Sequence, residues 1–168
     1  AWNLAYLGFY ERTGLRLGDT WNATIAVPAA GQDGRADTAA GLVGAETDIG
    51  RGALLTSTLI ANYYGLRDIG LEPPTTNVAA SPWQYNYTDN NGAVHALRVA
   101  FKFNLAGNYN YMFIDNLPGE LGIALDTMVD GEAGAAAGDF LAVNAADATL
   151  ASWPIATTVG GARWRMQF

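Results

Sequence analysis

The feature that most limits how this chain can fold is a strict alternation of residue types on either side of Asp89-Asn90-Asn91-Gly92. Aromatic residues alternate with polar ones over Trp83–Thr88, and a second alternating run covers His95–Phe103. A period of two is the pattern of a half-buried strand, and Asp or Asn followed by Gly between two such runs is typical of a hairpin turn. The sequence therefore predicts antiparallel β structure in its second half.

A third strand and a short helix are predicted directly after this hairpin. Tyr109–Ile114 is an aromatic-rich run that reads as the strand. The helix restarts the chain beyond Asp115-Asn116 and stops at Asp130-Gly131, with Pro118 in its first turn and Glu120 near the positive end of its dipole. Its predicted core face consists of Leu117, Leu121, Ala124, Leu125 and Met128.

The N-terminal half predicts mainly helices. Apolar residues recur at helical spacing over Trp2–Leu17 and again over Ala53–Gly65, where the final glycine suits a left-handed C-cap. Trp21–Val27 is either a short strand or a continuation of the first helix before Pro28 stops it.

Two segments rich in glycine and alanine, 29–52 and 131–148, are predicted to be surface loops. A second hairpin is expected from Trp153–Val159 and Ala162–Phe168. The predicted fold class is α+β, with N-terminal helices packed on an antiparallel β-sheet and a short helix inserted into the chain of strands. For 168 residues we expect a single globular domain, 1–168.

Charge and composition exclude several classes of function. A net charge of -7 and a pI near 4.4 argue against a general nucleic-acid binder, because a phosphate backbone attracts clustered Lys and Arg. Cysteine is absent, which excludes disulfides and thiolate metal sites. No apolar run reaches about 18 residues, so the chain as given is expected to be soluble. Because it begins at Ala1 without Met, we expect a processed or truncated form with any membrane or signal segment upstream.

The sequence contains no recognisable catalytic constellation. His95 is the only histidine, and no Gly-x-Ser-x-Gly, P-loop or His-Glu-x-x-His motif accompanies it. Its place on the apolar side of the alternating run favours a packed histidine over a catalytic base. Glycoside hydrolysis needs two acids on opposed walls of a cleft, and nothing places two acids in that way. We therefore predict no enzyme activity, no catalytic residue and no organic cofactor.

An excess of carboxylates between Lys102 and Arg163 raises the question of calcium. Asp126 and Asp130 are four residues apart on the predicted helix, so their repulsion could be relieved by a bound cation. Carboxylate oxygens are the ligands that Ca²⁺ prefers. The candidate metal ligands are Asp126, Asp130, Glu132 and Asp139. The alternative is a solvated acidic surface, which the absence of an EF-hand spacing favours.

A ligand surface is the other site hypothesis. Arg98, Lys102, Arg163 and Arg165 all fall on the polar side of their predicted strands. If the last strand pairs beside the Ala96–Phe103 strand, these cations form a basic stripe. Stacking faces for single-stranded DNA would come from Trp83, Tyr85 and Tyr87. The same rings, with Tyr109 and Tyr111, could also form a platform for a glycan. The alternative is a solvated face of cations over a core of aromatic residues.

One segment resembles a known family. The run Phe113-Ile114-Asp115-Asn116-Leu117-Pro118-Gly119-Glu120 is followed by Ala124-Leu125-Asp126 and then by Asp130-Gly131 ahead of a Gly/Ala-rich segment. This pattern resembles minor type IV pilins and pseudopilins, in which a strand leads into a short helix that ends in an acidic-Gly pair before a final strand. The resemblance covers roughly Trp83–Phe168, and the family's N-terminal hydrophobic helix is absent from the chain as given.

The resemblance implies a non-enzymatic structural subunit. It would be the head domain of a type IV pilus or secretion filament protein, extracytoplasmic, with other pilin or pseudopilin subunits as partners and a role in assembly, surface display or cell adhesion. Contact with a membrane would be made only through the absent N-terminal helix. The family includes calcium-binding members, which implies the same for the carboxylates named above. The alternative from the aromatic strands is a secreted carbohydrate-binding module with an antiparallel β-sheet.

Overall fold

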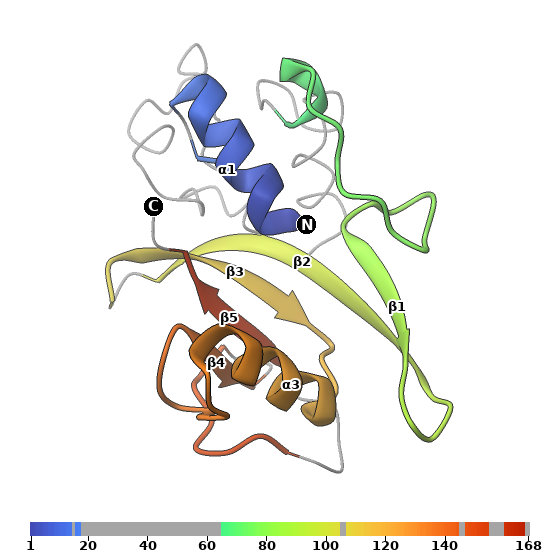
Figure 1. Cartoon of the computed structure of the whole chain (residues 1–168), viewed down its shortest axis with the longest axis vertical. Coiled ribbons are helices and arrows are strands. Elements are labelled where there is room, and N and C mark those ends of the chain that lie inside the picture. The colour runs from blue at the N-terminus through green and yellow to red at the C-terminus, as the bar shows by residue number, and fades with distance from the viewer. Residues whose placement is uncertain (15, 18–64, 105–106, 145–146, 155–159, 167–168) are drawn as a thin grey trace. The chain divides into compact units, whose positions relative to one another are not determined.

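A computed structural model describes residues 1–14, 16–17, 65–104, 107–144, 147–154 and 160–166. The structure confirms the predicted α+β class, because helices accompany a five-stranded antiparallel sheet with the strand order β1-β2-β3-β5-β4 (Figure 1). The chain divides into two compact units, Ala1–Thr76 with Ala100–Tyr111 and Asn77–Val99 with Met112–Phe168. The expected single domain, 1–168, stays a prediction.

In the first unit, helix α1 (Trp2–Thr13) packs its aromatic face on strand β2. Trp2, Tyr6 and Phe9 are buried, and the ring centroid of Tyr6 lies 4.9 Å from that of Phe101. The helix is shorter than the predicted Trp2–Leu17, because Gly14 adopts a left-handed conformation (φ 70°) and donates its N–H to the carbonyl of Tyr10. A short 3₁₀ helix, η2 (Arg67–Ile69), completes the described helical structure of this unit.

The expected helix over Ala53–Gly65, the segment Trp21–Val27 and the loop 29–52 lie outside the described residues, apart from Gly65 itself.

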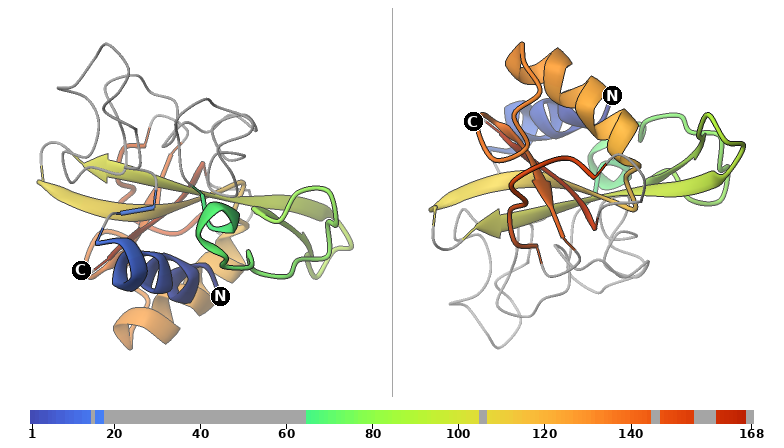
Figure 2. Two further views of the ribbon diagram at one scale, coloured as in Figure 1. Left: turned by 90° about the horizontal axis from the view of Figure 1, so that it is seen from above. Right: turned by 90° about the horizontal axis from the view of Figure 1, so that it is seen from below.

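The predicted first hairpin is confirmed. Strand β1 (Gln84–Thr88) pairs antiparallel with β2 (Val94–Asn104), and Asn86 lies opposite Ala96 in the register. β3 (Tyr109–Asp115) is the third predicted strand and the middle one of the sheet. In the views of Figure 2, β2 runs alongside β3, as the strand order requires. The central position of β3 explains why its residues from Asn110 to Phe113 are all buried.

The helix after β3 also forms, as α3 (Gly119–Asp130). Pro118 is the residue before the helix and not part of its first turn, and its extended conformation suits a chain that turns from strand into helix. Gly131 ends the helix in a left-handed conformation (φ 84°), with its N–H donated to the carbonyl of Thr127.

The predicted core face of α3 is partly wrong. Met128 is 81% exposed and Ala124 is also exposed, whereas Gly122 and Asp126 are buried. The reason is a tryptophan from a distant part of the chain, Trp153, which packs on Gly122 and bonds to Asp126. The helix is therefore rotated so that a glycine and an acid face inward.

The segment 131–148 is not only a surface loop. It contains strand β4 (Phe140–Val143), in which Phe140, Ala142 and Val143 are buried. β4 pairs antiparallel with β5 (Gly161–Arg165), so the last strand takes its hairpin partner from this segment and not from Trp153–Val159. Trp153 and Pro154 are not in a strand, and 155–159 lie outside the described residues. α3 packs beside β4 (Figure 1).

Candidate functional site

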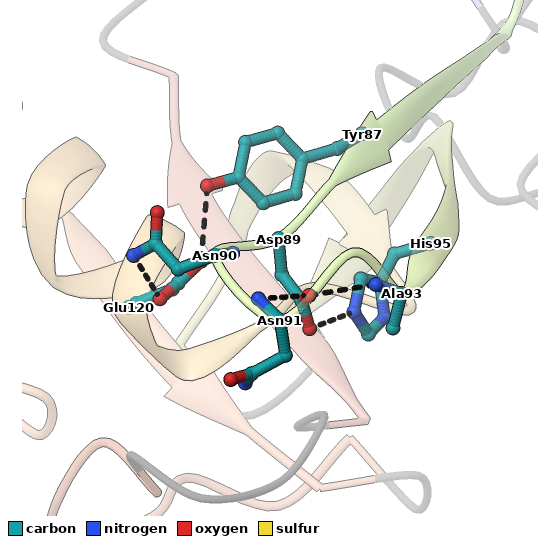
Figure 3. Close-up of polar contacts among 7 residues, drawn as sticks. All are labelled: Tyr87, Asp89, Asn90, Asn91, Ala93, His95 and Glu120. Atoms are coloured by element: carbon teal, nitrogen blue, oxygen red, sulfur yellow. Dashed lines mark hydrogen bonds and ion pairs between the residues drawn. The ribbon is translucent and has the colours of Figure 1, made fainter.

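The turn between β1 and β2 is built around the side chain of Asp89 (Figure 3). Its Oδ1 accepts hydrogen bonds from the backbone N–H groups of Asn91 (2.9 Å) and Ala93 (2.8 Å). The backbone closes the turn as well, because the N–H of Gly92 donates to the carbonyl of Asp89 at 3.0 Å. Gly92 has φ 83°, a conformation that residues with a Cβ rarely adopt. The predicted turn chemistry is thus present in full.

The second oxygen of Asp89 holds His95. The distance from Oδ2 to Nε2 is 2.9 Å, and the side chains of His95 and Asp89 are 15% and 14% exposed. The hydrogen bond from His95, together with that from the Ala93 backbone, lowers the pKa of the Asp89 carboxyl below its ordinary value. Within the described part of the chain, Asp89 is the only polar partner of the His95 ring. The Asp89–His95 contact therefore connects the turn to the start of β2.

Glu120 lies in the first turn of helix α3 and connects this helix to the β1–β2 hairpin turn (Figure 3). Its Oε1 accepts from the Tyr87 hydroxyl (3.1 Å), and its Oε2 accepts from Nδ2 of Asn90 (2.9 Å). The hydrogen bond to Glu120, with a smaller effect of desolvation, raises the pKa of the Tyr87 phenol above its ordinary value. We call this group the turn cluster. It comprises Tyr87, Asp89, Asn90, His95 and Glu120.

A second polar centre in the same unit is a buried carboxyl group. Asp126 is fully buried (0% exposed), and its Oδ2 accepts a 2.7 Å hydrogen bond from the indole Nε1 of Trp153. Burial, and secondarily the negative charge of Asp130, raise the pKa of the Asp126 carboxyl above its ordinary value against the opposing effect of the indole N–H. Gly122 lies one turn earlier on α3, where a Cβ would overlap the Trp153 ring.

A cavity of about 400 Å³ opens beside Trp153. Its walls are formed by Ile123 of α3, the glycine- and alanine-rich segment 133–137, and residues 151–153. The volume falls within the range of about 300–1,000 Å³ that is usual for small-molecule sites. Alanine methyl groups and the indole dominate the walls, so this cavity suits an apolar group of a ligand or partner.

The four carboxylates predicted to bind calcium are not gathered into one site. Asp126 faces Trp153, whereas both oxygens of Asp130 accept backbone N–H groups, from Asp139 at 3.0 Å and Phe140 at 2.9 Å. Glu132 is exposed. Among the residues that the structure describes, no group of three acidic or histidine side chains is arranged to hold a metal ion. Through these two backbone hydrogen bonds Asp130 fixes the start of β4.

The predicted basic stripe depended on β5 lying beside β2, and this premise is wrong because β3 lies between them. Arg163 is buried, with Nη2 bonded to Oδ1 of Asp147 at 3.1 Å and also to its carbonyl oxygen. Arg98 donates from Nε to the side chain of Gln84 at 3.3 Å. Lys102 is half-buried, and Arg165 is exposed. The four cations therefore differ in burial and in hydrogen-bond partners.

The three aromatic residues of the first hairpin also separate. Trp83 is buried, Tyr87 belongs to the turn cluster, and Tyr85 is 51% exposed. A flat platform of three rings for a sugar or a base is therefore not formed by these residues.

Sequence reasoning missed the partners of two side chains that it had singled out. Glu120 was assigned to the helix dipole, and its bonds to Tyr87 and Asn90 join residues about 30 positions apart. Trp153 was assigned to a strand, although it is the donor to Asp126. The sequence signal for this contact is that Gly122 and Asp126 lie one turn apart on the same side of α3. A glycine at that position leaves room for an aromatic ring whose N–H can bond to the acid.

Comparisons with protein-family models, with curated protein sequences and with solved structures find no match to this chain. In the part of the chain that the structure describes, no helix has both the length and the apolar character needed to span a bilayer.

Proposed function

We propose that the chain is a non-enzymatic structural subunit, the head domain of a minor type IV pilin or pseudopilin that acts in filament assembly or surface display outside the cytoplasm. The observation that carries the proposal is the path of the chain from β3 through α3 to β5. This path runs through the residues on which the family resemblance rests, and it consists of β3, α3, β4 and the final strand β5, so that one further strand stands between the short helix and the final strand.

The join between β3 and α3 gives this path its shape. Asn116 adopts a left-handed conformation (φ 56°) and donates its backbone N–H to the carbonyl of Gly160, next to the start of β5. The following residue, Leu117, is fully buried, and it belongs to the core cluster that also contains Phe140 and Trp153. The segment thus links the helix to the last strand through backbone and core contacts.

Helix α1 provides a surface for neighbouring subunits in this proposal. One side carries the buried aromatic residues, while Leu4 on the other side is 71% exposed. An exposed leucine on a helix is a natural contact point in an assembly, because covering it removes apolar surface from water.

The proposal is tested by fractionation of cells that produce the protein at its full natural length. Surface filaments are sheared off, separated from cell bodies and from the soluble medium, and probed with an antibody against this domain. We expect the protein in the filament fraction. Recovery only as free protein in the medium would contradict the proposal and favour the carbohydrate-binding module, which an array of immobilised polysaccharides would then examine.

A matched pair of variants makes the test specific. Leu4→Glu places a charge on the exposed side of α1 and is expected to lower incorporation into filaments. Met128→Glu changes an exposed apolar residue on α3 (81% exposed) and serves as the control. Equal incorporation of both variants would mean that the α1 surface has no role in assembly.

A further inference from the structure

Among the strands that the structure describes, β1 lies at one end of the sheet, so one of its edges is paired with β2 and no described strand pairs with the other (Figure 1). The N–H of Val99 donates to the carbonyl of Trp83, so Trp83 and every second residue after it point their backbone groups toward β2. Alternation then directs the peptide groups of Gln84, Asn86 and Thr88 to the outer edge. An outer edge of this kind is a template for pairing with another strand.

At the start of this edge the backbone N–H of Gln84 donates to the carbonyl of Ser81 at 2.8 Å, and at its centre a single side chain covers Asn86. Nδ2 of Asn77 donates to the carbonyl oxygen of Asn86 at 2.8 Å, and the backbone N–H of Asn86 donates to Oδ1 of Asn77 at 2.8 Å. An antiparallel strand would exchange the same two hydrogen bonds with Asn86. The amide of Asn77 therefore imitates one residue of a partner strand, from an exposed position that precedes β1.

The composition of β1 suits pairing with itself. Its sequence Gln-Tyr-Asn-Tyr-Thr has no charge, proline or glycine, although the whole chain carries a net charge of -7. An antiparallel pair of two β1 strands centred on Asn86 would set Asn86 opposite Asn86, Tyr85 opposite Tyr87 and Gln84 opposite Thr88. These pairs place two amide side chains, two aromatic rings, and an amide and a hydroxyl opposite each other. No like charges are opposed. Uncharged segments of high β-propensity are the ones most prone to associate by their edges.

We propose that β1 is a strand-pairing surface for a second copy of this chain and that Asn77 is the cap that keeps it closed. Pairing requires the two hydrogen bonds of the Asn77 amide to break before the backbone of Asn86 is free. Removal of the cap is therefore expected to strengthen self-association while leaving the β1–β2 ladder untouched. This inference does not rest on the proposed function.

The test compares the wild type with Asn77→Ala by light scattering after size-exclusion chromatography over a concentration series. We expect the variant to reach twice the mass of the 17.8 kDa chain at concentrations where the wild type is monomeric. Its dimer dissociation constant should be roughly 30- to 10,000-fold lower, because two hydrogen bonds in each copy, four in the dimer, no longer need to be broken. Thr75→Ala, an exposed residue two positions earlier, is the control and should behave as the wild type.

A second variant identifies the edge that pairs. In Asn77→Ala/Asn86→Pro the outward N–H of Asn86 is removed, and proline is tolerated on an edge strand where its missing N–H faces outward. We expect this double variant to be monomeric with an unchanged circular dichroism spectrum. A dimer that persists in the double variant would overturn the proposal, as would a folded Asn77→Ala variant that stays monomeric.

A crosslinking experiment keeps the proposal open to refutation if Asn77→Ala does not fold. The chain has no cysteine, so Asn86→Cys in the wild-type background introduces a single thiol. Directly opposed residues of an antiparallel pair lie about 5.5 Å apart, within reach of a disulfide. We expect mild oxidation to yield a crosslinked dimer from Asn86→Cys, and little from Ala133→Cys, which is exposed elsewhere in the same unit. Equal yields from the two variants would contradict pairing through β1.

Discussion

Replacing Gly122 with alanine tests how α3 is held against Trp153. The new Cβ would lie 3.0 Å from Cη2 of Trp153 and would overlap Cε3 and Cζ3 of the same ring. The ring cannot turn away freely, because it is buried, stacks on Phe140 with centroids 5.9 Å apart and donates to Asp126 at 2.7 Å. Either the indole or the helix must move.

Opposing terms decide the size of the effect. Alanine in a helix interior gains about 1 kcal/mol over glycine from helix propensity. Overpacking a core costs about 1–3 kcal/mol, and a buried carboxyl that loses its donor costs about 1–3 kcal/mol more. The penalties outweigh the gain, and we expect the free energy of unfolding to fall by roughly 3 kcal/mol. For a chain of this length that loss lowers the melting temperature by roughly 6–12 °C.

Urea unfolding followed by circular dichroism measures this loss directly. Ala124→Gly on the exposed side of α3 is the control for helix propensity and should cost about 1 kcal/mol. In a Trp153→Leu background the ring that causes the overlap is absent, so Gly122→Ala should cost much less there than in the wild type. The reasoning is refuted if Gly122→Ala is as stable as the wild type, or if its cost is the same in both backgrounds.

The other predictions concern the carboxylates. The folded state raises the pKa of Asp126, so the stability that its neutral form contributes is present near pH 4 and is lost as the pH rises through the raised pKa. In thermal melts across this pH range, the melting temperature of Asp126→Asn should therefore decline less steeply than that of the wild type. The folded state lowers the pKa of Asp89, so the stability that the ionised carboxylate contributes is present above its ordinary pKa and is lost as the pH falls through the lowered pKa. Asp89→Asn should remove this acid sensitivity, and an unchanged midpoint of acid unfolding would contradict the prediction. Asp130→Ala frees the N–H groups of Asp139 and Phe140 and should cost about 2–3 kcal/mol in urea unfolding, with faster hydrogen exchange in β4, whereas Glu132→Ala should cost almost nothing.

The elements that the sequence predicted correctly carry their signal locally. β1, β2 and their turn follow from alternation around Asp89 and Gly92, and the hydrogen bonds that close the turn run between Asp89 and residues 91–93. α3 ends where Gly131 adopts a left-handed conformation, which is also a local property. Of the candidate sites, local pattern placed His95 on its strand, and it named Asp89 as a turn residue. It did not reveal that the two side chains bond to each other.

The errors share a physical cause, which is that burial and pairing are decided by contacts distant in sequence. Phe140–Val143 is a run of only four residues between glycine-rich and alanine-rich stretches, and it becomes a strand because β5 pairs with it and Asp130 holds its first N–H groups. Asp126 looked like a surface acid until an indole 27 residues away supplied its donor. Arg163 was predicted to be a surface cation, but it is buried and donates to the side chain of Asp147, which follows β4. Asp126 and Arg163 are each buried beside a hydrogen-bond partner from a distant part of the chain, and composition or periodicity carries no record of that partner.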